Sequence, residues 1–249
     1  MIATAQMRFL LLTLYAPMGS FGEIAVGERR MSWARPGRSA VLGLVAAAQG
    51  IERSDEAAHR ELEDRLHFAV RTDGPGRPVV DYHTAQTPKA RRGRTFATRR
   101  EELEADALNT VLSVREWRTD AFFTVVLWPR AGRTVDLDSI AECLRRPGFV
   151  LYVGRKSAPL GLPLNPTIVE ATTFMDALDA HPPNEVEQSV LNHTRIDGVA
   201  YGTIACDHDA PDAPAEGRVE RRRDAIASRV RWQFEERLER VVSPENGEA

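Results

Sequence analysis

Residues 149–166 read FVLYVGRKSAPLGLPLNP, which combines an apolar segment, a glycine, two adjacent cations and a proline-rich loop. The β-branched and aromatic side chains of residues 149–153 predict a buried strand. Gly154 allows the backbone to turn after this strand, so Arg155 and Lys156 are expected in solvent. The end of this strand is therefore a candidate site for a negatively charged ligand.

The residues at this strand end suit a nucleic-acid backbone. Arg155 can bond two phosphate oxygens through its planar guanidinium, Ser157 offers a hydroxyl, and Tyr152 provides a face on which a base can stack. The alternative is a surface turn in which Arg155 and Lys156 are simply solvated. That alternative is favoured on this segment alone, and further segments shift the balance toward RNA.

Composition limits the class of protein. A chain of 249 residues with 43% hydrophobic content can bury a core and holds one large or two small domains. The longest apolar runs, 9–14 and 41–48, are too short to cross a bilayer, and residues 1–6 do not resemble a signal peptide. Cys143 and Cys206 lack the spacing of a disulfide framework or a zinc site, which favours a reduced cytoplasm. We therefore expect a cytoplasmic protein without membrane contact, metal or cofactor.

Charge is distributed unevenly along the chain. The net charge of −3 argues against a generic nucleic-acid binder, yet KARRGRTFATRR at 89–100 carries six cations and no anion. EELEAD at 101–106 then carries four anions. A basic face on an acidic protein can still bind RNA, and a solvated loop is the alternative. The candidate RNA ligands in this segment are Lys89, Arg91, Arg92 and Arg94.

Periodicity predicts the order strand, helix, strand, strand, helix, strand. This βαββαβ order is that of an α+β, ferredoxin-like (RRM-like) core, whose sheet would recognise single-stranded RNA by stacking. The expected elements are a strand at 9–14, a helix from Ser39 to Gly50, a helix at 55–66, strands at 67–72 and 121–128, a helix at 137–144 and the strand at 149–153.

Residues 73–119 separate the second and third predicted strands. An interval of this length is too long for an ordinary connection, so it is expected to be an inserted, exposed arm. The core domain would then span residues 7–172, with this arm inside it.

Residues 173–249 are expected to form a C-terminal extension with a basic tail. DHDAPDAPAEG at 207–217 predicts a solvent-exposed loop. Between residues 218 and 240 apolar side chains recur every four positions, which favours an amphipathic helix. These side chains are Ile226, Val230, Phe234 and Leu238. The arginines at 221–223 are expected on a solvated face.

Five segments, taken in their order along the chain, carry a resemblance to a known family. They are LTLYAPMGSFG at 12–22, RPGRSAVLGLVAAAQGI at 35–51, VDYHTAQ at 80–86, REWRTDAFFTVVLWP at 115–129 and the stretch at 149–166. Together they resemble the CasD family, the guide-RNA-capping subunit of type I-E Cascade CRISPR surveillance complexes. The resemblance covers about residues 7–171, and the strings DYHT and LYVGRKSAPLGLP are its most specific parts.

The resemblance implies a noncatalytic RNA-binding subunit of a ribonucleoprotein complex in antiviral defence. Such a subunit caps the 5′ handle of the CRISPR guide RNA (crRNA) and uses a thumb-like arm to dock on the neighbouring Cascade backbone subunit. It also contacts the Cascade large subunit and meets target DNA indirectly through the complex. In this family the C-terminal tail is often basic and strand-like.

The family's handle-contacting positions can be carried over residue by residue. They correspond to Met18, Phe21, Arg38, Arg115, Tyr152, Arg155, Lys156 and Ser157. Met18 and Phe21 could instead belong to the core, and Arg115 could pair with a neighbouring carboxylate. The sequence departs from the common pattern by having residues 19–21 as GSF, where a glutamine and a tryptophan are frequent, and Ala40 where glycine is usual.

An enzyme is the main alternative. A metal-independent endoribonuclease needs a general base near the ribose hydroxyl and a cation for the developing charge, and Tyr82 and His83 could act beside Arg155 and Lys156. A histidine at a strand end more often has a structural role. The sequence contains no GxSxG, HExxH or P-loop motif. A stand-alone RRM-like RNA binder is a third possibility.

Overall fold

A computed structural model of the protein describes residues 6–23, 25, 27–89, 93, 95–104, 107–196 and 201–243. The elements are, in chain order, β1 (Met7–Gly19), β2 (Phe21–Gly22), β3 (Arg29–Arg30), β4 (Ser32–Trp33), α1 (Arg38–Ala48), α2 (Glu56–Arg65), β5 (Leu66–Pro88), α3 (Arg99–Leu103), β6 (Leu108–Pro129), α4 (Leu137–Arg145), β7 (Thr167–Ala171), α5 (Phe174–Asp179), α6 (Glu185–Thr194), β8 (Thr203–Asp207), β9 (Arg218–Ser228) and β10 (Gln233–Val242).

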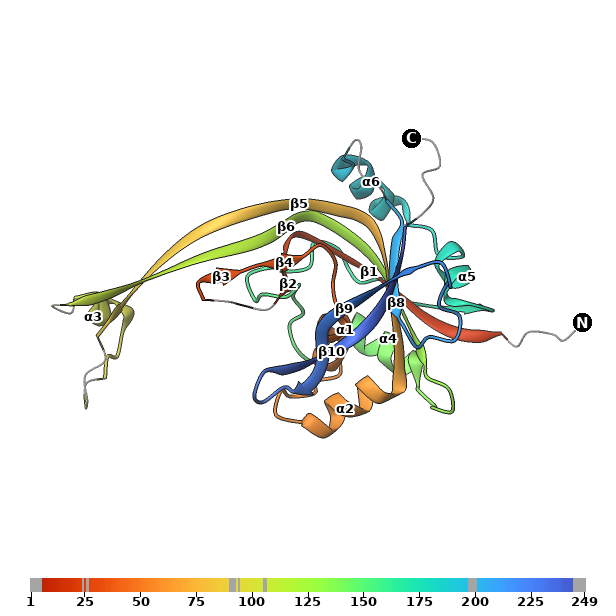
Figure 1. The fold of residues 1–249 in the computed structure, drawn as a ribbon, viewed down its shortest axis with the longest axis horizontal. Coiled ribbons are helices and arrows are strands. Elements are labelled where there is room, and N and C mark those ends of the chain that lie inside the picture. The colour runs from red at the N-terminus through yellow and green to blue at the C-terminus, as the bar shows by residue number, and fades with distance from the viewer. Residues whose placement is uncertain are drawn as a thin grey trace, which may run out of the picture.

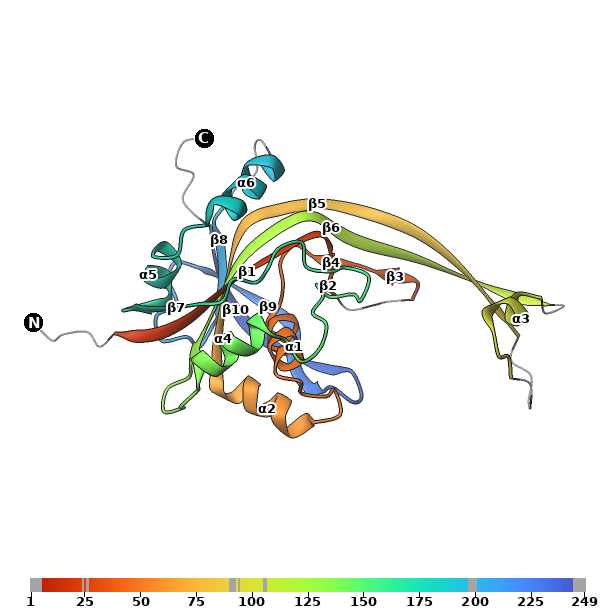
Figure 2. The same cartoon turned by 180° about the vertical axis from the view of Figure 1, so that it is seen from behind.

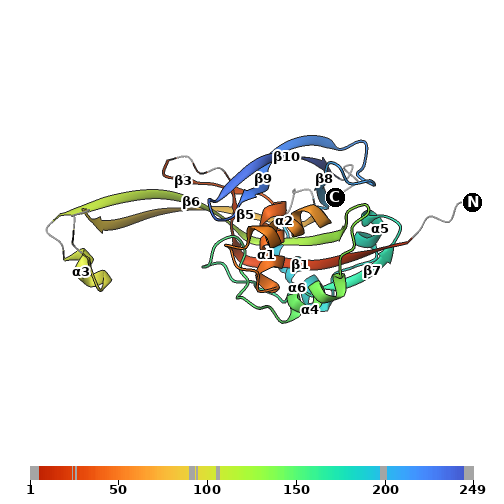
Figure 3. The same ribbon diagram turned by 90° about the horizontal axis from the view of Figure 1, so that it is seen from below.

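One mostly antiparallel sheet runs through the body and continues into a long arm (Figure 1). Its strand order is β7-β1-β6-β5-β8-β10-β9, with β3 added beside β6 as the one parallel neighbour in the described part of the chain. The edge strands β7 and β9 lie on opposite sides of the body (Figure 3). The protein therefore has a mixed α+β fold.

Helices cover both faces of this sheet (Figure 2). Leu10, Leu12 and Leu14 of β1 join one apolar core with α1 and α4, while Phe9 and Leu11 join a second core with α5. Alternate residues of a strand face opposite sides, which explains why β1 is apolar at nearly every position. The expectation that the body of the sheet presents an open RNA-binding face is therefore wrong.

The predicted helices at 39–50, 55–66 and 137–144 are confirmed as α1, α2 and α4. The Asp55 carboxylate accepts a hydrogen bond from the Ala58 amide at the start of α2, as expected of an N-cap. The N-cap of α1 is Gly37, so this helix begins at Arg38, one residue before its predicted start. No helix among the described residues is long and apolar enough to span a membrane.

The predicted strand at 149–153 is wrong. This segment makes a single isolated bridge, between Tyr152 and Pro159, and the Val150 side chain is 86% exposed. The amides of Gly148 and Phe149 donate instead to carbonyls at the end of α1. These amides are therefore bonded outside the sheet. The strand that pairs with β1 at this edge is β7, and the sequence pattern did not predict β7.

The interval 73–119 consists largely of the outer halves of β5 and β6, which pair from Leu66 with Pro129 to Pro88 with Leu108 with a register shift between Thr72 and Gly74. The two strands form a curved ribbon that extends far from the body and carries α3 near its tip (Figure 1). The strands predicted at 67–72 and 121–128 are the inner parts of this ribbon.

The helix predicted between residues 218 and 240 is wrong, because this segment forms the β9–β10 hairpin. A spacing of four places apolar residues on one side of a helix, and it also places them on one face of a strand. The buried side chains of β9 include Arg222 and Asp224, which are charged and so gave no apolar signal. The arginines at 221–223 consequently divide between solvent and the interior.

Candidate nucleic-acid interface at the base of the arm

The loop after Val153 is fixed to the end of β1 by backbone bonds. The Ser20 amide donates to the Val153 carbonyl (3.2 Å), and the Val153 amide donates to the Ala158 carbonyl (2.8 Å). Gly154 has φ +81°, and a Cβ there would lie 1.6 Å from the Ser20 carbonyl oxygen. Only glycine combines this φ with this contact, so Gly154 allows the tip with Arg155 to approach the sheet.

Arg155 packs across the base of the arm. Its guanidinium lies 4.3 Å from the centre of the Trp117 ring on β6, and its Nη2 donates to the Arg30 carbonyl on β3 (3.2 Å). Its Nη1 is buried and has no hydrogen-bond partner among the described residues. Burial, with Arg115 and Arg30 nearby, lowers the pKa of Arg155 below its ordinary value, although the group remains cationic at neutral pH.

Three arginines from three separate segments meet at this place. Arg30 of β3 and Arg115 of β6 are register partners on adjacent strands, and Arg155 contacts Arg30 from the loop. Asp81 of β5 lies opposite Arg115 and is the carboxylate that most favours the charge of Arg155. Three cations against one anion leave a net positive site, which we call the arm-base cluster (Arg30, Arg115, Trp117 and Arg155).

Lys156 and Ser157 follow Arg155 in the same loop and are exposed. Tyr152 is 39% exposed, so its ring is accessible to a base as the sequence suggested. Met18, at the end of β1, is 41% exposed. Phe21 is only 2% exposed and packs edge-on against Phe123, so it belongs to the core. The expected RNA contact of Phe21 is therefore wrong.

Tyr82 and His83 lie on the arm but point to opposite faces, because they are consecutive residues of β5. His83 shares its face with Asp81, to which its Nδ1 lies at 3.8 Å. Tyr82 is 64% exposed on the other face. The two side chains cannot act together on one ribose. Lys89, just after the end of β5, is exposed, and Arg91, Arg92 and Arg94 lie outside the described residues.

Arg38 is not accessible to RNA, which corrects the expectation for this residue. It is 2% exposed, and its Nη2 donates to the carbonyls of Glu63 (2.6 Å) and Leu66 (2.7 Å). Its Nη1 and Nε pair with the carboxylates of Asp207 and Glu63. Every nitrogen of the guanidinium is bonded within the protein, so Arg38 holds α1, α2 and β8 together.

Asp207 is the centre of the buried ion pairs around Arg38. Burial opposes its ionisation, but the adjacent His67, Arg38 and Arg237 outweigh burial and hold the pKa of Asp207 below its ordinary value. Arg237 also donates to Asp224 (2.6 Å), which links β10 to β9. These pairs attach the C-terminal hairpin to the body.

Two members of the arm-base cluster were missed from the sequence. Trp117 stands between two arginines in REWRTD, and an aromatic residue beside cations is a signal that could have been used. Arg30 gave no such signal, because its place follows from the parallel pairing of β3 with β6, which joins residues far apart in sequence.

The chain resembles known proteins along most of its length. A family model described as CRISPR-associated protein (Cas_Cas5) matches residues 9–239. The CRISPR system Cascade subunit CasD of Escherichia coli (strain K12) is 29% identical over 194 residues, which cover 78% of this chain and 80% of that protein.

Solved structures agree with this result. A chain of a CRISPR RNA-guided surveillance complex is similar with a TM-score of 0.62 and 26% identity, over 96% of this chain and 90% of the other. A crystal structure of a Cas protein is similar with a TM-score of 0.58 and 25% identity, over 94% of each chain. Because the family model spans nearly the whole fold, including the arm and the C-terminal hairpin, the chain belongs to the CRISPR-associated Cas5 family.

Proposed function

We propose that this protein is a noncatalytic RNA-binding subunit of a type I-E Cascade complex and that it holds the 5′ handle of the guide RNA. The observation that carries the proposal is the arm-base cluster, where the cations Arg30, Arg115 and Arg155 meet with Asp81 as the one carboxylate described beside them. The relation to a Cascade subunit and to a chain of an RNA-guided complex supports RNA as the ligand.

The chemistry of the cluster fits a bent phosphate backbone. Arginine binds phosphate oxygens through parallel N–H donors, and a guanidinium stacked on Trp117 keeps its orientation before the ligand arrives. Tyr152, Lys156 and Ser157 lie along the same loop and would contact the next nucleotides. Exposed cations along the arm, such as Lys89, would extend the contact away from the body.

We further propose that the arm docks on the Cascade backbone subunit, that the large subunit contacts the body, and that target DNA is read through guide pairing. A ribbon that projects from the body is suited to reach a neighbouring subunit.

The antiparallel order β7-β1-β6-β5 with α1, α2 and α4 supports a ferredoxin-like core over 7–172, with 173–249 as an extension. We place the complex in the cytoplasm.

The noncatalytic part of the proposal rests on the arm geometry. His83 is exposed and has Asp81 as its charged neighbour, while Tyr82 faces away from it. Without a processing nuclease, neither the wild-type protein nor His83→Ala is expected to cleave repeat RNA, measured as the rate and position of repeat cleavage. Cleavage by the wild-type protein that is lost in His83→Ala, with an unchanged melting temperature, would support the endoribonuclease instead.

Binding of a repeat-derived RNA by the assembled complex tests the main proposal. Arg155→Ala is expected to weaken binding by roughly 10- to 100-fold, because one charge-assisted contact is worth about 1.5–3 kcal/mol. Arg155→Lys keeps the positive charge but loses the parallel N–H donors of the guanidinium. Its RNA affinity should therefore lie between those of the wild-type protein and Arg155→Ala. Arg146→Ala, whose side chain is 86% exposed at the end of α4, is the matched control. Equal affinity for all four proteins would contradict the proposal.

A further inference from the structure

A carboxylate lies among the cations of the arm-base cluster. Asp81 of β5 is the register partner of Arg115 on β6, and its side chain is 48% exposed. A carboxylate repels the phosphates that the neighbouring arginines would bind, so it weakens the attraction of the cluster for an RNA backbone. Phosphate binding therefore does not explain Asp81.

Asp81 does not hold the arginines of the cluster by a direct bond. Among the described residues, its carboxylate forms no hydrogen bond and no ion pair with any of these three cations, although its charge favours the cationic form of Arg155. Carboxylates that do hold arginines in this protein make short contacts, as Asp224 does with Arg237 Nε at 2.6 Å. The positions of the three cations thus do not depend on a bond to Asp81.

His83 is the one ion-pair contact of Asp81 in the described part of the chain. Its Nδ1 lies 3.8 Å from the carboxylate. This separation is too long for a hydrogen bond, so Asp81 neither fixes the imidazole ring nor is satisfied by it. The His83 and Asp81 side chains are 46% and 48% exposed. The two carboxylate oxygens of Asp81 are therefore accessible acceptors.

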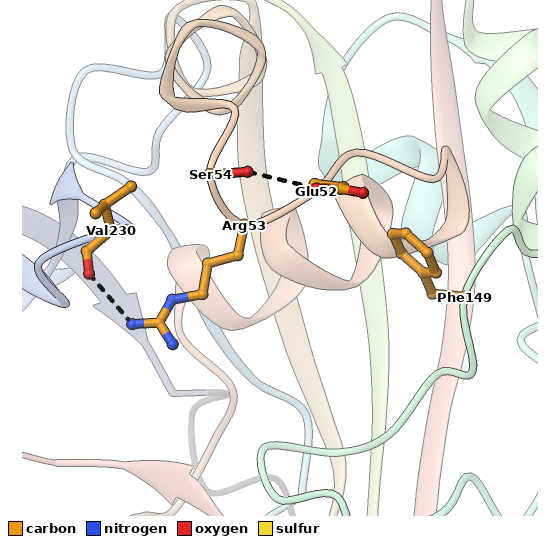
Figure 4. Close-up of a pocket in the computed structure, with 5 residues that line it drawn as sticks. All are labelled: Glu52, Arg53, Ser54, Phe149 and Val230. Atoms are coloured by element: carbon orange, nitrogen blue, oxygen red, sulfur yellow. Dashed lines mark hydrogen bonds between the residues drawn. The ribbon is translucent and has the colours of Figure 1, made fainter.

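Glu52 shows the contrast with a carboxylate that is bonded within the protein. It lines a surface pocket together with Arg53, Ser54, Phe149 and Val230 (Figure 4). Its carboxylate accepts a hydrogen bond from Ser54 Oγ (3.5 Å), and the adjacent Arg53 donates to the Val230 carbonyl (3.5 Å). Both charged groups of this pocket are bonded to the protein itself, whereas Asp81 has no such bond among the described residues.

Asp81 lies on the same face of the arm as the stacked Arg155. Residues that oppose each other in an antiparallel pair share a face, so Asp81 and Arg115 lie on one face of the ribbon. Trp117 is two residues from Arg115 and so lies on that face as well, with the Arg155 guanidinium 4.3 Å from the centre of its ring. A nucleotide bound through Arg115 and Arg155 would therefore lie on the Asp81 side of the ribbon.

The cluster offers surfaces that can hold an unstacked base. Proteins that read single-stranded RNA stack each base on an aromatic ring or on a guanidinium plane and bond to its edge. The loop after β6 and α4 supplies the 39% exposed ring of Tyr152 and the guanidinium of Arg155, which packs on Trp117. Of these two surfaces, the guanidinium is close enough to Asp81 to be affected by its charge.

The acceptors of a carboxylate determine which base it can read. An ionised carboxylate has two oxygen acceptors and no donor. Guanine presents two adjacent, parallel donors on its Watson–Crick edge, which are N1–H and the N2 amino group. Adenine and cytosine each place an acceptor nitrogen beside their amino group, and uracil has one N–H between two carbonyls. Guanine is therefore the base that pairs with both oxygens at once, while the other bases bring an acceptor against the carboxylate.

We propose that Asp81 determines base specificity in the arm-base cluster, by accepting hydrogen bonds from N1–H and the N2 amino group of one unpaired guanine in the bound RNA. Arg115 and Arg155 contact phosphates of the same stretch of RNA, and Asp81 selects the base. The inference rests on the proposed function, because it requires that the cluster binds RNA. It adds a residue that reads sequence to contacts that bind the backbone.

Inosine substitution tests this specificity. Inosine is guanosine without the N2 amino group, so it keeps N1–H and removes one of the two donors. A repeat-derived RNA is prepared with each guanine replaced in turn by inosine, and its affinity for the assembled complex is measured. We expect one position at which inosine weakens binding to the wild-type protein by roughly 10- to 100-fold, as for one hydrogen bond to a charged group.

Variants of Asp81 assign this effect to one residue. In Asp81→Ala, the guanine and inosine RNAs are expected to bind with equal affinity at the sensitive position. Asp81→Asn replaces one acceptor by a donor and should also lose the discrimination. Asp64→Ala removes an exposed carboxylate from α2, outside the cluster, and is the matched control that should keep the wild-type discrimination.

The outcomes separate this inference from a structural role of Asp81. If Asp81→Ala keeps the discrimination and lowers both affinities, Asp81 only positions the arginines; if it keeps the discrimination and raises both, Asp81 only repels phosphate. Either result, or the absence of an inosine-sensitive position in RNA that the wild-type complex binds, would overturn the inference alone. A wild-type complex that binds none of these RNAs would contradict the proposed function, and the inference with it.

Discussion

At the scale of single residues, surroundings decide what an arginine does. Arg38 and Arg155 both matched RNA-contacting positions in the family resemblance, yet Arg38 is fully bonded inside the protein and Arg155 has an unpartnered nitrogen. The sequence cannot distinguish the two, because the partners of Arg38 lie up to 169 positions away, at Asp207. The residue type predicted a cation at both positions. The tertiary contacts determine that the Arg38 cation is bonded within the protein, whereas Arg155 is not fully bonded.

Arg38→Met is expected to destabilise the fold by about 3–5 kcal/mol, because Asp207 and Glu63 would be left buried with a partner removed. Chemical denaturation of the purified protein measures this change. Arg146→Ala, at an exposed site, should alter the free energy of unfolding by less than about 0.5 kcal/mol. An Arg38 variant of wild-type stability with impaired RNA binding would restore the original prediction that Arg38 contacts RNA.

Gly154→Ala is expected to move the Arg155 loop and reduce both stability and RNA affinity, since its Cβ would meet the Ser20 carbonyl oxygen at 1.6 Å. Gly132→Ala is the control, because Gly132 has a similar φ of +71° but open space where its Cβ would lie. The control should cost only the backbone strain, about 1–2 kcal/mol, and leave RNA affinity unchanged. Equal losses of stability in the two variants would show that the close approach at Gly154 is unimportant.

At the scale of elements, helices were easier to predict than strands. The helices α2 and α4 have local caps, Asp55 and Asp136, and α4 also has a 3.6-residue apolar period that the sequence shows directly. The segment at 149–153 has strand-like composition, but its Phe149 amide donates to the end of α1 and its Val153 amide donates to Ala158 in the following loop. The β9–β10 hairpin buries ion pairs, so hydrophobic periodicity did not reveal it.

The attachment of this hairpin should depend on pH through Asp207. Its folded-state pKa lies below its ordinary value of about 4, so its contribution to stability is complete above that pH and is lost as pH falls further. Asp207→Asn lacks this contribution at every pH. The stability difference between wild type and this variant, measured by denaturation from pH 7 to pH 3, should therefore narrow only below about pH 4. A constant difference would contradict the lowered pKa of Asp207.

At the scale of the whole molecule, the body is a closed α+β unit from which binding surfaces project. Helices cover both faces of the body sheet, and the base of the arm, where we propose that guide RNA binds, lies outside these two cores.

The most direct test of the central claim is to sequence the 5′ ends of RNA that copurifies with the protein. The tagged chain is expressed with a Cascade backbone subunit, a processing nuclease and a repeat–spacer transcript. We predict one uniform, repeat-derived 5′ end that is absent without the nuclease, lost in the Arg115→Ala, Arg155→Ala double variant and retained in Arg146→Ala. The same uniform end and yield in a folded double variant would contradict the claim that the arm-base cluster holds the guide RNA.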